Sequence, residues 1–348
     1  MMHMPATVFF LDLRKRHKDN VLHRWDRLID TTSCLEIVPK NAAVAVKVHF
    51  GEDGNVNFLN PLFARRMVER IREKGGQPFL TDTTTLYGGR RFRANTHLEL
   101  ARDHGFDFAP VIIADGMLGD EFYEVNGSKF GRAYRTVEVF FFLSHFKGHM
   151  VTSFGGALKN IGMGCGSKGG KLDMHAHSRP NVEQERCNFC LRCFEYCAYQ
   201  AIEKQGFEPV EKQKRTVRIL GGKCVGCGGC MAVCPERAIR NTWASSPADV
   251  CQRMAKHAAD FYRTKKSFCF NFLIRIAPEC DCFHTNEPLI APDVGILASS
   301  DPVALDQASL DLVREPIVKA HPDLEPDEQL IAAERFGGGE RKYEIKNI

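Results

Sequence analysis

The sequence predicts an α/β protein, in which a mostly parallel sheet domain is interrupted by a small α+β module rich in cysteine. Three observations lead to this prediction. Strand and helix patterns alternate from residue 42 to residue 153. They resume between residues 245 and 313. Between the two regions, residues 187–198 and 224–235 repeat one cysteine spacing.

The first strand–helix–strand unit lies between residues 42 and 82. Residues 42–50, "AAVAVKVHF", form an almost continuous apolar run of strand length. A helix is predicted at 60–76, where Asn60 is the N-cap and Pro61 occupies the first helical position. Residues 77–82, "QPFLTD", then predict a second buried strand. Such a βαβ unit favours a parallel sheet and places Asp82 at the carboxyl end of a strand, where open α/β sheets collect their sites.

The remaining elements follow the same pattern on both sides of the cysteine repeats. Helices are predicted at 245–263, with Ser246 as N-cap, and at 301–313. We expect residues 1–179 and 243–348 to build one α/β domain, with the module inserted at 180–242. A separate C-terminal domain is the alternative, but it would have only about 100 residues to bury a core. The predicted strands are residues 110–116, 135–144, 148–153, 267–276 and 293–299.

Composition favours a cytoplasmic protein. No apolar run approaches the roughly 18 to 20 residues that cross a bilayer, so no membrane association is expected. The basic cluster at 14–18 follows an apolar run, which is the reverse of a secretory signal. Lys and Arg number 47 against 43 acids, which gives no strong preference for nucleic acid. In a reducing cytoplasm, the 14 cysteines indicate metal ligation rather than disulfides.

Eight of these cysteines form two copies of the pattern C-x2-C-x2-C-x3-C. Zinc modules usually pair one C-x2-C with a distant second pair. Cysteines in successive x2 steps instead wrap a loop around one corner of an iron–sulfur cubane. The repeat continues beyond the cysteines, because "CAYQAI" at 197–202 aligns with "CPERAI" at 234–239. Each half is therefore predicted to form a loop, a short helix and a return strand, related by a pseudo-two-fold axis.

This repeat resembles the bacterial two-[4Fe–4S] ferredoxin module. The resemblance implies two [4Fe–4S] clusters, with the last cysteine of each repeat ligating the other cluster. Pro235 fits the C-P ending of the ferredoxin pattern, whereas Ala198 departs from it and adds an N–H donor. The implied ligands are Cys187, Cys190, Cys193 and Cys234 for one cluster, and Cys224, Cys227, Cys230 and Cys197 for the other.

Five further stretches resemble one family throughout. They are "VKVHFGE" (46–52), "DTTTLYGGRR" (82–91), "IIADGMLGDE" (112–121), "SHFKGHMVTSFGGALKNIGMGCGSKGGK" (144–171) and "PDVGILASSDPVALDQASLDLV" (292–313). This is domain-of-unknown-function family 362 in its ferredoxin-fused form, described as uncharacterised Fe–S centre proteins, and the resemblance spans about residues 6 to 313. It implies a cytoplasmic iron–sulfur protein but supplies no reaction.

The glycine-rich stretch 144–171 is a candidate second site. It fails the nucleotide-binding pattern G-x4-G-K-[ST], because Cys165 stands at the first glycine position and Leu172 follows the lysine. We expect a loop at a strand end that offers backbone N–H groups to a small anion. Alternatively, the glycines only allow close packing on the module. The side chains expected to hold the anion or donate a proton are Lys147, Lys159 and His149.

Cysteines outside the module fall into two groups. Cys280 and Cys282 follow a predicted strand, where side chains two residues apart face the same way. Both thiols could therefore contact one ligand, which favours metal binding or redox chemistry, and His284 is close by in the sequence. The alternative is that they are two ordinary reduced thiols. Cys34, Cys165, Cys251 and Cys269 are expected to be buried as small apolar residues. His175 and His177 are interpreted as a solvated pair, with metal ligation as the alternative.

Two classes of function remain open. In the first, the chain is an iron–sulfur oxidoreductase, in which the clusters pass electrons to a site where the stretch 145–171 meets Cys280 and Cys282. In the second, it is a non-catalytic electron carrier or adaptor whose α/β domain docks partner proteins. The sequence has no nicotinamide or flavin fingerprint, so a redox partner protein is expected to supply the electrons.

Overall fold

An eight-stranded sheet forms the centre of the computed structural model, which describes residues 5–348 except 16, 177–178, 207–214, 242–244 and 284–286. Within these residues, the strand order is β16-β1-β15-β14-β7-β2-β3-β4. The strands are β1 (Ala6–Asp12), β2 (Ala43–Val48), β3 (Gln77–Asp82), β4 (Val111–Ile113), β7 (Val139–His145), β14 (Lys266–Leu273), β15 (Gly295–Ser299) and β16 (Tyr343–Asn347).

Most of the strand pairs are parallel, which confirms the predicted α/β class. Strands β14, β7, β2, β3 and β4 run in one direction. Strand β15 is antiparallel to both of its neighbours, and β16 is parallel to β1. Strand β7 comes before the cysteine-rich module and β14 after it, yet they are adjacent, with Phe141 opposite Phe268. The two α/β parts of the chain thus contribute to a single sheet.

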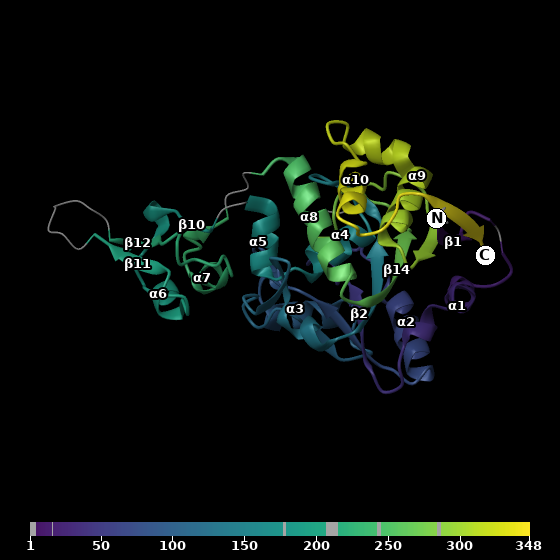
Figure 1. Cartoon of the computed structure of the whole chain (residues 1–348), viewed down its shortest axis with the longest axis horizontal. Helices are drawn as coiled ribbons and strands as arrows, with labels where there is room; N and C mark the ends of the chain where they lie inside the picture. The colour runs from purple at the N-terminus through teal and green to yellow at the C-terminus, as the bar shows by residue number, and fades with distance from the viewer. Residues whose placement is uncertain (1–4, 16, 177–178, 207–214, 242–244, 284–286) are drawn as a thin grey trace.

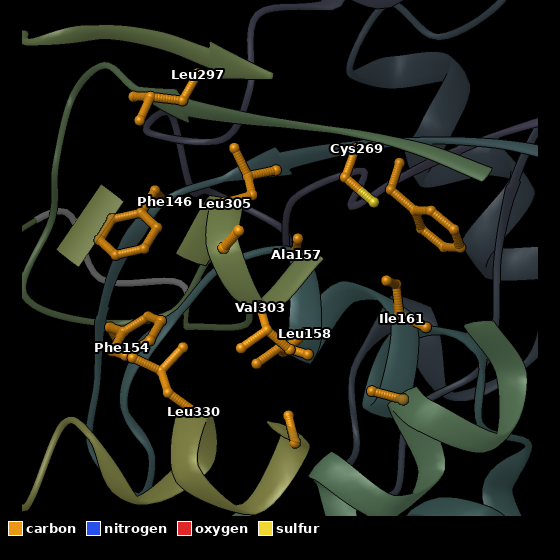
Figure 2. Packing of buried hydrophobic residues seen from close by; sticks show 14 of the residues in the cluster. Phe146, Phe154, Ala157, Leu158, Ile161, Cys269, Leu297, Val303, Leu305 and Leu330 are labelled. Atoms are coloured by element: carbon orange, nitrogen blue, oxygen red, sulfur yellow. The ribbon is translucent and has the colours of Figure 1, made fainter. Parts of the chain in front are cut away.

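Helices cover both faces of this sheet and bury two apolar clusters. Along β7, Phe140 and Phe142 belong to one cluster, and Phe141 and Leu143 to the other. Figure 2 shows part of the first cluster. It lies under α4 (Ala157–Cys165), α8 (Pro247–Tyr262), α9 (Pro302–Ala320) and α10 (Glu328–Arg335). The second lies under α1 (Val21–Thr32), α2 (Pro61–Glu73) and α3 (Ala94–Asp103).

The predicted helix starts are confirmed. Asn60 accepts a hydrogen bond from the Leu62 N–H at the start of α2, and Ser246 accepts one from the Asp249 N–H at the start of α8. Helix α9 runs to Ala320, beyond the predicted end at 313. Val313 is non-helical, so the chain kinks there and continues as a second helical segment.

The prediction of a strand at 148–153 is wrong. These residues span a tight turn between β8 (Lys147–His149) and β9 (Ser153–Gly155). His149 stabilises this turn, because its Nδ1 accepts hydrogen bonds from the N–H groups of Val151 and Thr152. Ser153 has a left-handed φ of 63°, which ends the turn.

The prediction that the rest of the glycine-rich stretch is a loop is also wrong. It forms α4 and then α5 (Lys168–Ala176). Asp306 of α9 caps α4, since its carboxylate accepts hydrogen bonds from the N–H groups of Ala157 and Leu158 at 2.7 and 2.9 Å. This long-range cap starts a helix in a sequence whose glycines disfavour one.

The cysteine-rich module lies at one end of the molecule, beyond α5, and the chain termini lie at the other end (Figure 1). Strands β10 and β13 form one antiparallel pair, and β11 and β12 form another. A further hairpin, β5 (Phe122–Val125) and β6 (Ser128–Gly131), belongs to the α/β domain. The elements of the module are β10 (Asn181–Val182), α6 (Arg192–Tyr196), β11 (Ile202–Gln205), β12 (Thr216–Ile219), α7 (Gly229–Val233) and β13 (Ile239–Arg240).

The two halves of the module have the same backbone conformation. Residues 37 positions apart share the left-handed region at three places. Their φ values are 57° and 67° at Phe189 and Gly226, 60° and 80° at Leu191 and Gly228, and 49° at both Gln200 and Arg237. The repeat in the sequence is therefore a repeat in structure. None of the helices described in the structure has the length and apolar character to cross a membrane.

Candidate functional site

The cysteines of the module line two cavities. One, of about 20 Å³, is lined by Cys187, Cys190, Cys193 and Cys234. The other, of about 210 Å³, is lined by Cys197, Cys224, Cys227 and Cys230. Each cavity takes three cysteines from one repeat and the fourth from the other. These are the two sets of four that the resemblance to ferredoxin implies.

The surroundings of these sulfur atoms also repeat. The Ala201 N–H donates to Cys197 Sγ at 3.3 Å, and the Ala238 N–H donates to Cys234 Sγ at 3.2 Å. Such N–H groups stabilise negative charge on ligating sulfur. In the described part of the chain, no three His, Cys, Asp or Glu side chains are close enough to hold a single metal ion.

Polar and apolar contacts join the module to the α/β domain. Arg93 Nη2 donates to the Ala232 carbonyl at 2.6 Å, and Lys129 Nζ donates to the Val225 carbonyl at 2.8 Å. The Tyr196 hydroxyl donates to Asp120 Oδ2 at 2.7 Å. Leu86, in the loop after β3, packs into the apolar cluster that contains Cys187 and Cys193.

A third cavity, of about 110 Å³, lies at the carboxyl ends of the parallel strands. Strand β2 leads into His49, β3 ends at Asp82, and β7 ends at His145. The chain after β14 contributes Cys280 and Cys282, and α4 contributes Lys159. Leu86 lines this cavity too, so one residue contacts both the cavity and the apolar cluster of the module.

Buried ion pairs form one wall of the cavity. Asp82 lies 2.9 Å from Lys47 Nζ and 2.8 Å from Arg91 Nη2, and all three side chains are buried. Burial opposes ionisation of Asp82, but Lys47 and Arg91 outweigh it and hold the pKa of this carboxyl well below its usual range. Arg91 Nη1 also lies 2.6 Å from His49 Nε2 and 3.0 Å from the Tyr87 hydroxyl.

A second buried carboxylate, Asp281, supports the opposite wall. It lies 2.8 Å from His145 Nδ1 and 2.9 Å from Lys147 Nζ. Burial opposes its ionisation, but His145 and Lys147 outweigh that effect and lower the pKa of Asp281 well below the usual value. The carboxylate thereby fixes two side chains that face the cavity.

Cys280 and Cys282 lie in a turn rather than in an extended strand. The Phe283 N–H donates to the Cys280 carbonyl at 3.0 Å and closes the turn. The Cys282 N–H donates to Cys280 Sγ at 3.4 Å, and Lys159 Nζ lies at the same distance from this sulfur. A hydrogen bond from the Cys282 thiol, together with Lys159 and Lys147, outweighs burial and lowers the pKa of Cys280 well below 9.0. Of the two thiols, Cys280 is therefore the more acidic, and Cys282 is the one whose pKa is raised.

The structure therefore brings Lys159, Cys280, Cys282 and Lys147 together at one cavity. It does not bring His149 there, because that imidazole is buried in the β8–β9 turn, where burial lowers its pKa well below 6.5. His175 does line the cavity, and desolvation lowers its pKa to about 4. His177 and His284 lie outside the described residues.

The four other cysteines outside the module are buried, as predicted. Burial raises the pKa of Cys34, Cys165 and Cys251 to about 12. Burial also raises the pKa of Cys269 well above its usual value.

Sequence reasoning missed several side chains of this cavity, namely His49, Tyr87, Arg91 and Asp281. A signal was available for three of them. His49 immediately follows the apolar strand pattern, and Tyr87 and Arg91 stand in the same loop as Asp82, which the strand-end argument had already identified. Asp281 gave no such signal, because its role depends on a turn that the sequence did not reveal.

Three known proteins show what the chain is similar to. The pyruvate synthase subunit PorD of Thermotoga maritima is 37% identical over 65 residues, which are 18% of this chain and 54% of the relative. The chain thus spans about half the length of this curated relative. The lactate racemase apoprotein of Thermoanaerobacterium thermosaccharolyticum has a TM-score of 0.40 and 10% identity, over 89% of this chain and 57% of that one. A Thermotoga maritima protein of known crystal structure has a TM-score of 0.39 and 11% identity, over 92% and 60%.

A family model identifies the chain more directly. The model described as "Domain of unknown function (DUF362)" matches residues 44–311, which is well over half of the sequence. This range begins in β2 and ends in α9, so it includes the strands around the third cavity and the inserted module. The chain belongs to the DUF362 family.

Proposed function

We propose that this chain is a cytoplasmic iron–sulfur protein that carries two [4Fe–4S] clusters and relays electrons to a ligand site in its α/β domain. One observation carries the proposal: two cavities are each lined by four cysteines, three from one repeat and one from the other. Cys187, Cys190, Cys193 and Cys234 would hold one cluster, and Cys197, Cys224, Cys227 and Cys230 the other. Bound there, the clusters supply one-electron transfer.

The module's own residues prepare both sites in the same way. Equivalent left-handed residues fold the two loops identically, and equivalent N–H groups reach Cys197 and Cys234. The apolar cluster around Cys187 and Cys193 excludes water from one side. We assign residues 180–242 to this module and place the rest of the chain, 1–179 and 243–348, in one α/β domain.

The third cavity supports a ligand site rather than a docking function alone. Lys159, Cys280 and Cys282 converge on it, and Leu86 joins its wall to the apolar cluster of the module. Lys159 and Lys147 are suited to hold a small anion, because both positively charged side chains line the cavity. We propose that His149 helps to position Lys147, because its hydrogen bonds hold the turn that follows this lysine. A purely non-catalytic carrier would need no such cavity.

A redox partner protein is the proposed source of electrons. The 65-residue match to a subunit of pyruvate synthase is about as long as the module, which supports an electron-transfer role within or beside a larger assembly.

Metal analysis tests this proposal. Anaerobically purified protein should contain about eight irons and eight sulfides per chain, because each of the two clusters holds four of each. Its visible absorption should bleach when dithionite is added. A chain that contains stoichiometric zinc and no sulfide would contradict the proposal.

A further inference from the structure

We propose that Cys280 and Cys282 are a redox-active dithiol, which reduces a small anionic disulfide bound in the third cavity and is itself regenerated by two electrons from the clusters. The regeneration step rests on the proposed function. The exchange between the dithiol and the disulfide rests on the cavity alone, so the two parts can be tested separately.

The turn brings the two cysteines together at the cavity. Cys282 is two residues after Cys280, its backbone N–H donates to Cys280 Sγ at 3.4 Å, and the Phe283 N–H closes the turn on the Cys280 carbonyl. Both cysteines line the cavity. A nucleophilic thiolate beside a second thiol is the arrangement of an attacking and a resolving cysteine. The remaining cysteines of the α/β domain, within the described residues, are buried and do not line this cavity.

Two donors stabilise the thiolate on Cys280. Lys159 Nζ and the Cys282 N–H each lie 3.4 Å from Cys280 Sγ. Cys280 in turn keeps Lys159 protonated: burial alone would lower the pKa of this lysine, but the charge and hydrogen bond of Cys280 raise it. The pair therefore places the sulfur beside a positive charge, which increases the fraction present as the thiolate, the form that attacks disulfides.

The charge of the cavity wall selects an anion. Among the described side chains that line the cavity, Asp82 is the one carboxylate, and it is paired with Lys47 and Arg91. Asp281 does not line the cavity, but its carboxylate forms an ion pair with Lys147 and neutralises that charge. The thiolate on Cys280 offsets Lys159 in the same way. Five cations against these three anions still leave a surplus of positive charge, which raises the local concentration of anionic ligands. The cationic lining residues are Lys47, Arg91, Lys147, Lys159 and Lys171.

The exchange balances without any other reactant. Cys280 Sγ attacks one sulfur of the ligand's disulfide, forms a mixed disulfide and expels the first ligand thiolate. That thiolate takes the proton of the Cys282 thiol. Cys282 Sγ then attacks Cys280 Sγ, which forms the internal disulfide and releases the second ligand thiolate.

Regeneration needs two electrons and one proton. The electrons break the internal disulfide, leaving a thiolate on Cys280, and the proton goes to Cys282 Sγ. Two one-electron clusters match this demand, and Leu86 connects the cavity wall with the apolar cluster around Cys187 and Cys193.

Thiol mapping tests the exchange. Cluster-loaded protein is treated anaerobically with one equivalent of dithiodiglycolate, a small dianionic disulfide, and the remaining thiols are alkylated and located by peptide mass. Wild type should lose the thiols of Cys280 and Cys282 together. Cys282→Ser should stop at a mixed disulfide on Cys280, and Cys280→Ser should form no adduct on Cys282. Cys251→Ala, which changes a buried cysteine of α8, is the matched control and should behave as wild type.

Ligand charge gives an independent readout. Dithiodiglycolate should oxidise the pair about tenfold faster than the neutral bis(2-hydroxyethyl) disulfide, after correction for their rates with free cysteine. Lys159→Met should remove most of this preference, whereas Lys319→Met on the exposed surface of α9 should retain it. Equal rates for both disulfides in wild type would overturn the anion-binding part of the inference. Thiols that react only after a chelator removes a stoichiometric metal would overturn the dithiol itself.

Reoxidation of the clusters tests the coupling. Clusters are reduced with dithionite, excess reductant is removed, and dithiodiglycolate is added. Their visible absorption should return in wild type and Cys251→Ala but not in Cys280→Ser. If the clusters never assemble, the proposed function fails, but thiol mapping still tests the exchange between the dithiol and the disulfide. If they assemble but do not reoxidise through Cys280, the inference fails and the proposed function stands.

Discussion

Cys197 and Cys227 line the same cavity, although Cys197 belongs to the first cysteine repeat and Cys227 to the second. We therefore expect Cys197→Ala to damage the cluster held by the second loop. Cys234→Ala should damage the cluster held by the first loop, because Cys234 lines the other cavity. Iron content and electron paramagnetic resonance of the reduced variants will show which cluster is affected. If each substitution alters the cluster of its own loop, the pairing is wrong.

The rate at which Cys280 reacts with iodoacetamide should rise less between about pH 6 and pH 8 than that of an ordinary thiol. The pKa of Cys280 is lowered well below 9.0, so more of this sulfur is ionised at these pH values than of an unperturbed cysteine. At pH values below its pKa, an ordinary thiol would instead react about tenfold faster for each unit by which the pH rises. Lys159→Met removes a positive charge 3.4 Å from the sulfur, so it should raise the pKa of Cys280 and make the rate depend more strongly on pH.

Peptide mass after timed alkylation measures these rates in the cluster-loaded protein. Cys251 is an internal reference, because burial raises its pKa to about 12 and it should stay unmodified throughout. A wild-type rate for Cys280 that rises steeply from pH 6 to pH 8 would show that this sulfur is protonated.

Asp82→Asn should lower the free energy of unfolding by about 3–5 kcal/mol, because it leaves Lys47 and Arg91 buried without their shared counter-charge. Asp19→Asn is the matched control, since Asp19 pairs with Arg27 at the surface and its loss should cost about 0–1 kcal/mol. Chemical denaturation monitored by tryptophan fluorescence can compare the two, because Trp25 is buried in the α/β domain. Equal effects of both substitutions would refute the role of burial at Asp82.

Gln200→Gly should stabilise the module by about 0.5 kcal/mol. Gln200 is exposed and left-handed, with φ of 49°, which costs a non-glycine residue about 1–2 kcal/mol. Glycine removes this strain but adds about 0.5–1 kcal/mol of backbone entropy. Glu195→Gly, on the exposed face of α6, should instead destabilise by about 1 kcal/mol. The rate of cluster loss on anaerobic heating provides the comparison, and faster loss in Gln200→Gly would contradict the strain argument.

Local patterns were sufficient for much of the sheet and for the helices with strong caps. Asn60 and Ser246 mark the starts of α2 and α8 because each side chain bonds an N–H within three residues. The start of α4 could not be predicted in this way. Its cap, Asp306, is 149 residues away from Ala157 in the sequence, and nothing near Ala157 announces it.

The two-fold repeat of the cysteine-rich module could be predicted, because the spacing of its cysteines recurs 37 residues later in the sequence. The third cavity could be predicted only in part. Lys159, Cys280 and Cys282 stood out as residue types, but their meeting point depends on how four strand ends converge. His149 was chosen in the sequence because imidazoles bind anions and transfer protons. In the structure it is buried in the β8–β9 turn, where its Nδ1 accepts hydrogen bonds from backbone N–H groups of that turn.

The adjacency of β7 and β14 has a consequence for biosynthesis. On the ribosome, β7 emerges first, and its edge toward β14 stays unpaired until the whole module has been translated. The strands of the module pair with one another, β10 with β13 and β11 with β12, and within the described residues they need no later strand. Folding of the module can therefore begin on a chain whose host sheet is still open, and the third cavity is completed only when the turn of Cys280 and Cys282 follows β14. Truncation before β14 would leave a folded module attached to an exposed, aggregation-prone strand.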